Sequence, residues 1–253
     1  MTPEALIHEV VVVPRSAFAP LADIQVIRRP GWMQIITPTF KGGGLNEVCC
    51  AVLDAADADA IIDRTIAEYR ALGLVFRWTV GPDSRPHDLG ARLEARGLVR
   101  HEVLGMCRET RGAALTGEVE VERVTMDRVD EFTAVMTTGW GMDPAPFHAY
   151  HRAALGDPER RHRLFLARDD SGRAVGAAGT VLFEKSAYLI GAVVLPEHRK
   201  RGVYRALTDA RLADAAALGR ALATTHARAA TSAPLLERRG FQRVCRFASY
   251  GSG

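Results

Sequence analysis

The stretch VLPEHRKRGVY at residues 194–204 decides how this chain folds. It lies at the end of an apolar run, 187–195, which predicts a strand, and it leads into a helical pattern that starts near Gly202. The first N–H groups of a helix have no partners within it, and the helix dipole gives that end a partial positive charge. Arg199, Lys200 and Arg201 add full charges to the same turn, and Gly202 has no Cβ to hold a ligand away. The stretch is therefore typical of a strand–helix turn that binds phosphate.

The composition indicates a protein that can bury a sizeable core. Apolar residues make up 47% of the 253 residues and charged residues 25%, as in ordinary globular domains. The net charge of +3 includes many arginines, which we attribute to coding bias. Nucleic-acid binding requires a long basic stripe with interleaved aromatic residues, and none is present, so we expect no nucleic-acid partner.

The sequence carries no sign of export or of a metal centre. The apolar run at 10–13 is too short for a secretion signal, and no stretch has transmembrane length. The four cysteines lack Cys-x-x-Cys spacing, and no Glu or Cys completes a metal-ligand set with His148 and His151. We expect a cytoplasmic protein with reduced thiols, no membrane contact and no metal ion.

A segment of small residues, 111–117, separates two halves of similar length. We predict one domain at 1–112, a linker at 113–117 and a second domain at 118–253. The patterns of the second half predict the order β-α-α-β-β-β-α-β-α-β. The predicted strands are 118–124, 163–167, 174–183, 187–195, 221–225 and 241–249, and the predicted helices are 126–136, 144–155, 202–218 and 233–239.

The first half has the features of a diverged copy of the second. Residues 93–100 match residues 236–243 at five of eight positions, and each segment lies just before a predicted last strand. A helix predicted at 58–72 occupies the place of the helix at 202–218. No basic turn precedes it, and the acidic residues Asp54 and Asp57 have the wrong charge to bind pyrophosphate. We therefore expect the first half not to bind a nucleotide.

Two motifs in the second half resemble the signatures of the GNAT superfamily of acetyl-CoA-dependent N-acetyltransferases. Residues 194–204 resemble the family's Val-x-Pro strand end followed by Arg-x-x-Gly-x-Gly/Ala, with Tyr204 in the last position. Residues 235–241, LLERRGF, resemble its Leu-Tyr-x-x-x-Gly-Phe. The resemblance implies an α/β fold with a mixed sheet that splays near the cofactor. Here it implies two GNAT-like halves in tandem, of which only the C-terminal one has the coenzyme A signature.

The resemblance also implies where acetyl-CoA binds. The strand residues Ala192, Val193 and Val194 are expected to offer backbone groups to the pantetheine arm, with the Val194 N–H as oxyanion donor. The turn that follows is expected to hold the pyrophosphate through Arg199, Lys200, Arg201, Gly202, Val203 and Tyr204.

The acid–base groups are less well defined by the sequence. Glu184, Asp143 and His226 are candidate general bases, and a water chain is an alternative. The family's thiolate-protonating Tyr falls at Leu236, which cannot donate a proton, and Ala229 lies nearest to the place of a capping Asn. The candidate replacements for that acid are Tyr188, Tyr204, Tyr250 and water.

An acceptor pocket is predicted around Trp140, Phe147 and Tyr150. Aromatic faces together with Asp143 suit a cationic amine through cation–π contact and charge pairing. The first hypothesis is therefore an N-acetyltransferase that acts on a small-molecule amine. The alternatives are a protein acetyltransferase for lysine or N-termini and a coenzyme A-binding module without catalysis. The sequence leaves open whether the chain is a monomer or a homodimer, and whether the acyl group is longer than acetyl.

Overall fold

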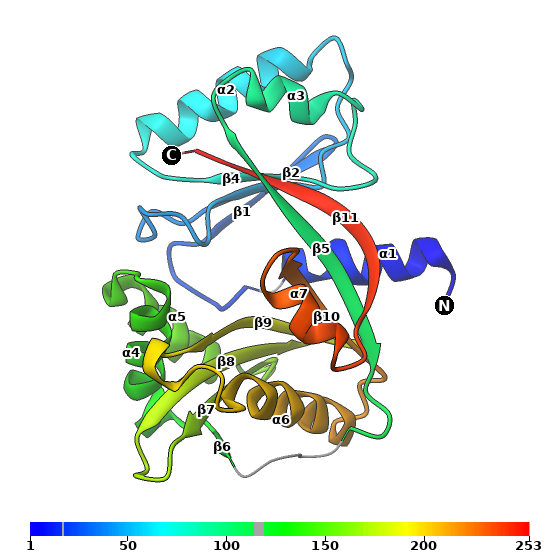
Figure 1. Cartoon of the computed structure of the whole chain (residues 1–253). Helices are drawn as coiled ribbons and strands as arrows, with labels where there is room; N and C mark the ends of the chain where they lie inside the picture. The colour runs from blue at the N-terminus through cyan, green and yellow to red at the C-terminus, as the bar shows by residue number, and fades with distance from the viewer. Residues whose placement is uncertain (17, 114–118, 253) are drawn as a thin grey trace. The chain divides into compact units, whose positions relative to one another are not determined.

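The computed structural model describes residues 1–16, 18–113 and 119–252. These form two compact units, and Figure 1 shows their elements. The first unit comprises Met1–Leu21 and Met106–His226, and the second comprises Ala22–Gly105 and Ala227–Gly253. The predicted linker, 113–117, lies outside the described residues except for Ala113.

The two units are not the two halves predicted from the sequence. The last helix and strand of the chain pack in the second unit, and the N-terminal helix packs in the first. A division by contacts is a different property from an internal similarity of sequence. The halves 1–112 and 118–253 therefore stay a prediction.

The first unit contains a mixed sheet in the order β10-β9-β8-β7-β6. Its pairs are antiparallel, except that β9 and β10 are parallel. The strands are β6 (Glu120–Arg123), β7 (His162–Arg168), β8 (Ala174–Leu182), β9 (Ser186–Val194) and β10 (Leu222–Arg228).

Helices cover both faces of this sheet, because alternate strand residues on each face are apolar. Phe132 and Met136 of α4 (Val129–Trp140) pack in one core cluster with Leu166 and Val193. On the other face α6 (Val203–Ala217) packs its Leu207 in a cluster with strand residues of β7, β8 and β9. The remaining helices of the unit are α1 (Pro3–Val11), α5 (Pro144–Gly156) and the short 3₁₀ segments η1 (Val13–Ser16), η2 (Met126–Arg128) and η3 (Pro196–His198).

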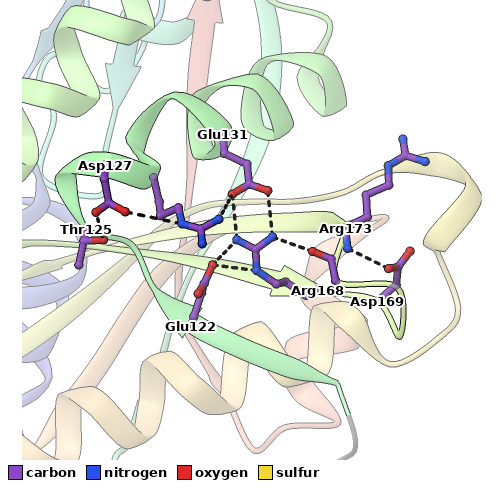
Figure 2. A network of polar contacts seen from close by, with 9 residues as sticks. Glu122, Thr125, Asp127, Glu131, Arg168, Asp169 and Arg173 are labelled. Carbon is purple, nitrogen blue, oxygen red and sulfur yellow. Dashed lines mark hydrogen bonds and ion pairs between the residues drawn. The ribbon is translucent and has the colours of Figure 1, made fainter.

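An arginine network fastens the outer strand and α4 to β7 (Figure 2). The Arg168 guanidinium, only 10% exposed, pairs with Glu122 of β6 and with Glu131 of α4 at 2.8 Å. It also donates to the Gly172 carbonyl at 2.8 Å in the β7–β8 hairpin. Hydrogen bonding from Arg168 holds the pKa of Glu131 below its usual range. One side chain thereby joins four elements.

The second unit repeats a short strand–helix–strand arrangement with a parallel pair. Its strands follow the order β1-β2-β3-β4-β11-β5, with β3 parallel to β4 and β11 antiparallel to β4. Tyr69 and Ile62 of α2 are fully buried in one cluster with Trp78. The elements are β1 (Gln25–Arg29), β2 (Trp32–Ile36), β3 (Glu47–Cys49), α2 (Ala58–Ala71), β4 (Arg77–Val80), α3 (Leu89–Glu94), β5 (Val99–Glu109), α7 (Ser232–Glu237) and β11 (Gln242–Gly251).

The structure confirms the predicted order of elements in the second half of the chain. From β6 to β11 the helices and strands follow β-α-α-β-β-β-α-β-α-β once the 3₁₀ turns are set aside. The helix predicted at 58–72 is α2. The strand predicted at 118–124 appears as β6, which starts at Glu120. Residue 118 lies outside the described part.

Candidate functional site

The strands β9 and β10 separate after a short parallel pairing. Only Ser186–Tyr188 pair with Leu222–Thr224 in the described register. At the next position the Thr225 hydroxyl donates to the Leu189 carbonyl at 2.9 Å, so a side chain replaces the ladder bond. Because β9 continues to Val194, its last residues form an edge beside the opening. The parallel pair therefore splays as the resemblance implied.

A bulge and the register of β9 decide which backbone groups face this opening. Gly191 is the extra residue of the bulge, with a φ of +51°, and Ala192 and Val194 pair with β8 beyond it. The Leu195 N–H donates to the Val175 carbonyl of β8 at 2.9 Å. In an antiparallel ladder alternate residues point their backbone groups away from the partner. The N–H groups of Ala192 and Val194 therefore point to the open side.

This register refines the prediction for residues 192–194. Val193 bonds its backbone to β8 and packs its side chain against α4. A Cβ added at Gly139 of α4 would lie 2.0 Å from Val193 Cγ2, so the helix approaches the strand closely. Ala192 and Val194 are thus the two of the three that can offer backbone N–H groups to a ligand.

The basic turn ends this open edge. Arg199, Lys200 and Arg201 are exposed, and the Arg199 Nε donates to the Val194 carbonyl at 3.3 Å. Lys200 and Gly202 have left-handed backbone, with φ of +64° and +82°. A Cβ at Gly202 would meet only an Arg205 nitrogen at 3.9 Å, so glycine is favoured there by the backbone angle rather than by crowding.

The N-terminus of α6 has the geometry of an anion site. The N–H of Ala206 is the one that bonds to the Gly202 carbonyl, at 3.0 Å. The N–H groups of Val203, Tyr204 and Arg205 precede it and have no acceptor within the helix. Tyr204 is half-buried, and burial raises the pKa of its hydroxyl. Three exposed basic residues therefore directly precede the first N–H groups of α6, as is typical of an anion site.

Two of the predicted catalytic residues are in direct contact. The Tyr188 hydroxyl lies 3.0 Å from His226 Nδ1, and their ring centroids are 5.0 Å apart. His226 Nε2 in turn lies 2.7 Å from the Val10 carbonyl oxygen of α1. Tyr188 is the last residue of β9 that pairs with β10. The pair therefore stands where the two strands begin to separate.

The other two predicted bases have different positions. Asp143 Oδ1 accepts the N–H of Ala145 at 3.0 Å and so caps the N-terminus of α5. Glu184 is exposed in the hairpin that precedes β9, and its carbonyl accepts from Arg220 at 3.2 Å. The basic turn follows the opposite end of β9. Neither position adjoins the Tyr188–His226 contact along the strand.

The predicted acceptor residues lie on α4 and α5. Trp140 ends α4 and is 41% exposed, while Phe147 and Tyr150 lie on α5 beside His151. Burial raises the pKa of Tyr150 to about 12, and nearby Tyr188 contributes to that shift. The structure thus brings Tyr150 towards the Tyr188–His226 pair.

A buried polar group continues this row across the sheet. His162 of β7 pairs with Val181, which pairs with Tyr188, so the three share a face. The ring of Tyr150 meets that of His162 edge-on at 6.4 Å. Burial lowers the pKa of His162, although Asp157 lies 3.6 Å away.

The family's acid position and one candidate replacement lie in the second unit, and the other candidate replacement lies on α6. Leu236 of α7 is 2% exposed, and its carbonyl accepts the N–H groups of Arg239 and Phe241. Tyr250 of β11 is 5% exposed in the core cluster that contains Trp78. Tyr204 packs beside the α6 cluster. Tyr188 is the one of these tyrosines that bonds to an imidazole.

Sequence reasoning missed the residues that shape the open edge of β9 and the Tyr188–His226 pair. Gly191 had a signal, because an isolated glycine within a strand pattern is typical of a bulge. The contribution of Val10 had none, since a backbone carbonyl more than two hundred residues away leaves no pattern. Glu9 and Ser186 were missed for the same reason.

Comparison with protein families matches residues 127–241 to "Acetyltransferase (GNAT) family". A GCN5-related N-acetyltransferase from Kribbella flavida is similar over 100% of this chain and 95% of its own, with a TM-score of 0.72 and 14% identity. One from Sphaerobacter thermophilus has a TM-score of 0.63 and 15% identity over 88% of this chain and 80% of its own. A tandem GNAT protein from the clavulanic acid biosynthesis pathway has a TM-score of 0.62 and 14% identity, over 95% and 86%.

No curated protein sequence is significantly similar to the chain. Within the described ranges, none of the helices is both long and apolar enough to cross a bilayer. The same residues contain no group of three or more His, Cys, Asp or Glu side chains placed to hold a metal ion.

Proposed function

We propose that this chain, whose residues 127–241 match the GNAT acetyltransferase family, transfers an acetyl group from acetyl-CoA to a primary amine of a small molecule. The family supports acyl transfer as the reaction. The observation that carries the proposal is the open edge of β9 that leads directly into the basic turn. A donor of extended shape with a diphosphate at one end fits such a site.

The residues present fit acetyl-CoA along the whole edge. The pyrophosphate would lie on the N-terminus of α6, among Arg199, Lys200 and Arg201. The pantetheine arm would extend along β9, where it replaces the missing strand partner and bonds first to Val194, the residue nearer the basic turn. The thioester lies at the end of the arm away from the diphosphate, so its carbonyl would take the N–H of Ala192 rather than that of Val194, the donor expected from the sequence. This N–H would stabilise the oxyanion that forms during transfer.

The acceptor amine would approach from the face covered by α4 and α5. Trp140, Phe147 and Tyr150 supply aromatic surface there, and aromatic faces attract a cation. The ring of Tyr150 contacts that of His162, which shares a face of the sheet with Tyr188, so an amine held there would lie on the same face as Tyr188. These residues define the chemistry of the acceptor but not its identity.

Release of the coenzyme A thiol tests the proposal. Purified protein with acetyl-CoA is combined with a panel of amino acids, polyamines, amino sugars and aminoglycosides, and the free thiol is measured with Ellman's reagent. Thiol release that requires one amine class, with the acetylated amine found by mass spectrometry, is the expected result. Acetylation of whole proteins alone would favour the protein acetyltransferase instead.

One observation favours a second function. Leu236 occupies the place of the family's acid, and it is buried. If no other group protonates the thiolate, the chain binds the coenzyme without turning it over. Tight acetyl-CoA binding by calorimetry, together with no thiol release for any acceptor in the panel, would support a binding module without catalysis.

A further inference from the structure

Resting on the proposed function, we propose that Tyr188 and His226 form a proton relay whose direction is set by the N-terminal helix α1. Tyr188 would exchange protons with the acceptor amine and with the departing thiolate. His226 would hold the proton in between, and the bond to Val10 would fix which ring nitrogen accepts it.

The hydrogen bonds fix the tautomer of His226. A carbonyl oxygen can only accept, so the 2.7 Å contact with Val10 requires the proton of the neutral ring on Nε2. Nδ1 then carries the lone pair and accepts the Tyr188 hydroxyl at 3.0 Å. The Tyr188 proton is therefore already directed at a base, as activation of a hydroxyl requires.

Helix α1 forms hydrogen bonds with both strands of the parallel pair, β9 and β10. Ser186, the first residue of β9, donates its hydroxyl to Glu9 Oε1 at 2.5 Å, and both side chains are buried. Val10, the next residue of the helix, is fully buried and bonds to His226 of β10. Consecutive residues of one helix turn thus fix the start of β9 and the relay histidine together.

The relay faces the side on which the acceptor is expected. Tyr188 pairs with Val181 and Val193 pairs with Ala177, so these residues share one face of the sheet. Val193 packs in the same cluster as Phe132 of α4. Tyr188 therefore lies on the α4–α5 face, at the end of β9 opposite the basic turn.

The relay balances the protons of the reaction. The neutral amine attacks the thioester carbon, a C–N bond forms, and the amine gives one proton to Tyr188 Oη as the Tyr188 proton passes to His226 Nδ1. The imidazolium is held by the Val10 carbonyl. The C–S bond then breaks, and the reverse shift returns a proton from His226 through Tyr188 to the thiolate. Both residues end as they began, so no separate general acid is needed at position 236.

Two substitutions separate the relay from a structural role. Tyr188→Phe removes the proton carrier, and His226→Gln keeps one N–H donor and one acceptor but cannot take a proton. Each is expected to lower kcat by about 100-fold, the usual contribution of a positioned acid or base. The Kd of acetyl-CoA, measured by calorimetry, is expected to stay within about twofold.

The matched control is His148→Gln, which changes a half-buried histidine on α5 that pairs with Asp130. It is expected to leave kcat unchanged. If His226→Gln retains more than a third of the activity with the best amine, the relay is overturned while the proposed function stands.

Helix α1 is tested through Ser186. Ser186→Ala releases Glu9 and is expected to lower kcat about fivefold with the Kd of acetyl-CoA unchanged, whereas Ser186→Thr keeps the hydroxyl and is expected to restore the rate. An equal loss in both variants would contradict the role assigned to this bond.

A measurement that needs no turnover distinguishes failure of the relay from failure of the proposed function. In ¹⁵N-labelled full-length protein, two-bond ¹H–¹⁵N correlation spectra report the tautomer of each histidine. The signals of His226, assigned by their loss in His226→Gln, are expected to show the Nε2–H form. Ser186→Ala is expected to give a mixture of tautomers. A wild-type protein with the proton on Nδ1 would overturn the relay whatever its activity.

Discussion

Two strand–helix turns in this chain have the same place in their units and opposite chemistry. In the first unit β9 leads through a basic turn into α6, and in the second unit β3 leads through an acidic turn into α2. Each strand is parallel to the strand that follows the helix. Yet α6 begins at a left-handed Gly202, whereas α2 begins at Asp57 with Asp59 in its first turn.

The acidic turn supplies acceptors for its own first N–H groups. Asp54 accepts the N–H of Ala56 on its side chain at 2.9 Å and that of Ala58 on its carbonyl at 3.0 Å. The strand also differs, because β3 has three residues while β9 has nine and runs past its parallel partner. Among the described residues, β3 is paired with β2 on one side and with β4 on the other, so it offers a ligand no open edge next to this turn. A shared order of elements does not by itself make a site.

Replacing Gly202 by Asp is expected to have the largest effect, because it gives the basic turn the chemistry of the acidic one. The carboxylate repels the phosphates and the new Cβ strains a backbone with positive φ. The Kd of acetyl-CoA, measured by calorimetry, is expected to rise at least about 100-fold, or roughly 2.7 kcal/mol. Wild-type protein is expected to bind one equivalent per chain.

The matched control is Gly219→Asp at the other end of α6. Gly219 also has a positive φ, +73°, and no atom lies within 4 Å of an added Cβ. It therefore carries the same backbone strain without the anion site. If both variants bind acetyl-CoA equally, the basic turn is not the phosphate site.

The first unit has the helix pair α4 and α5, and no such pair lies between the first strands of the second unit among its described elements. A buried histidine in this pair predicts that the stability of the protein depends on pH. His151 is 5% exposed, Thr133 of α4 bonds to its Nδ1 at 2.8 Å, and burial lowers its pKa to about 4. A histidine with a depressed pKa binds its proton mainly in the unfolded chain. The stabilisation is therefore complete above pH 6.5 and is lost as the pH falls towards 4.

Urea unfolding measures this contribution. Between pH 7 and pH 5 the free energy of unfolding is expected to fall by about 2 kcal/mol on account of His151. His162, whose pKa burial also lowers, acts in the same direction. The slope is expected to decrease in His151→Phe, and an unchanged slope in that variant would contradict the assignment.

Arg168→Met tests the network that holds β6 and α4 to the sheet. It removes the Arg168 cation from Glu122 and leaves Glu131 with Arg128 at 3.4 Å. The expected loss is about 1.5 kcal/mol, reduced because both carboxylates are partly exposed. Urea unfolding at neutral pH measures it. Arg173→Met removes an exposed arginine paired with Glu197 at 3.5 Å and is expected to change stability by less than about 0.5 kcal/mol. Equal losses would show that Arg168 is an ordinary surface residue.

Asp54→Ala has the smallest expected effect and tests the acidic turn. It removes one side-chain bond to a backbone N–H, which contributes about 0.5–1 kcal/mol. The affinity for acetyl-CoA is expected to stay within about twofold. Asp57→Ala is the control, since Asp57 makes no side-chain cap bond to α2. Coenzyme binding that changed with Asp54 would break the contrast between the two turns.

The order of the elements and the basic turn were predictable because they rest on local patterns. The periodicities of residues 163–195 and 202–218 fix strands and a helix, and the charges at 199–201 mark the turn between them. Even the match between residues 93–100 and 236–243 has a local meaning. Gly97 and Gly240 have φ of +83° and +81°, and the Leu98 and Phe241 N–H groups bond back to Leu93 and Leu236 alike.

The candidate catalytic residues were predictable only as a set of unconnected residues. Tyr188 and His226 were candidates by type and approximate place, like Glu184 and Asp143. Their contact depends on the parallel register of β9 and β10, which no local pattern states. An aspartate at position 143 suits a helix N-cap as well as a general base, and in the structure it caps α5.

The sequence by itself determined the order of the elements, the basic turn and the acidic one, because each depends on neighbours a few residues apart. The tertiary structure alone decided that β9 extends beyond its pairing with β10 and that the N–H groups of Ala192 and Val194 face the opening. It also decided that Val10 bonds to His226. Those features arise from strand register and from packing between segments far apart in the chain. Hydrogen-bond direction in a sheet alternates with each residue, so a shift of one position would have assigned the site to other groups.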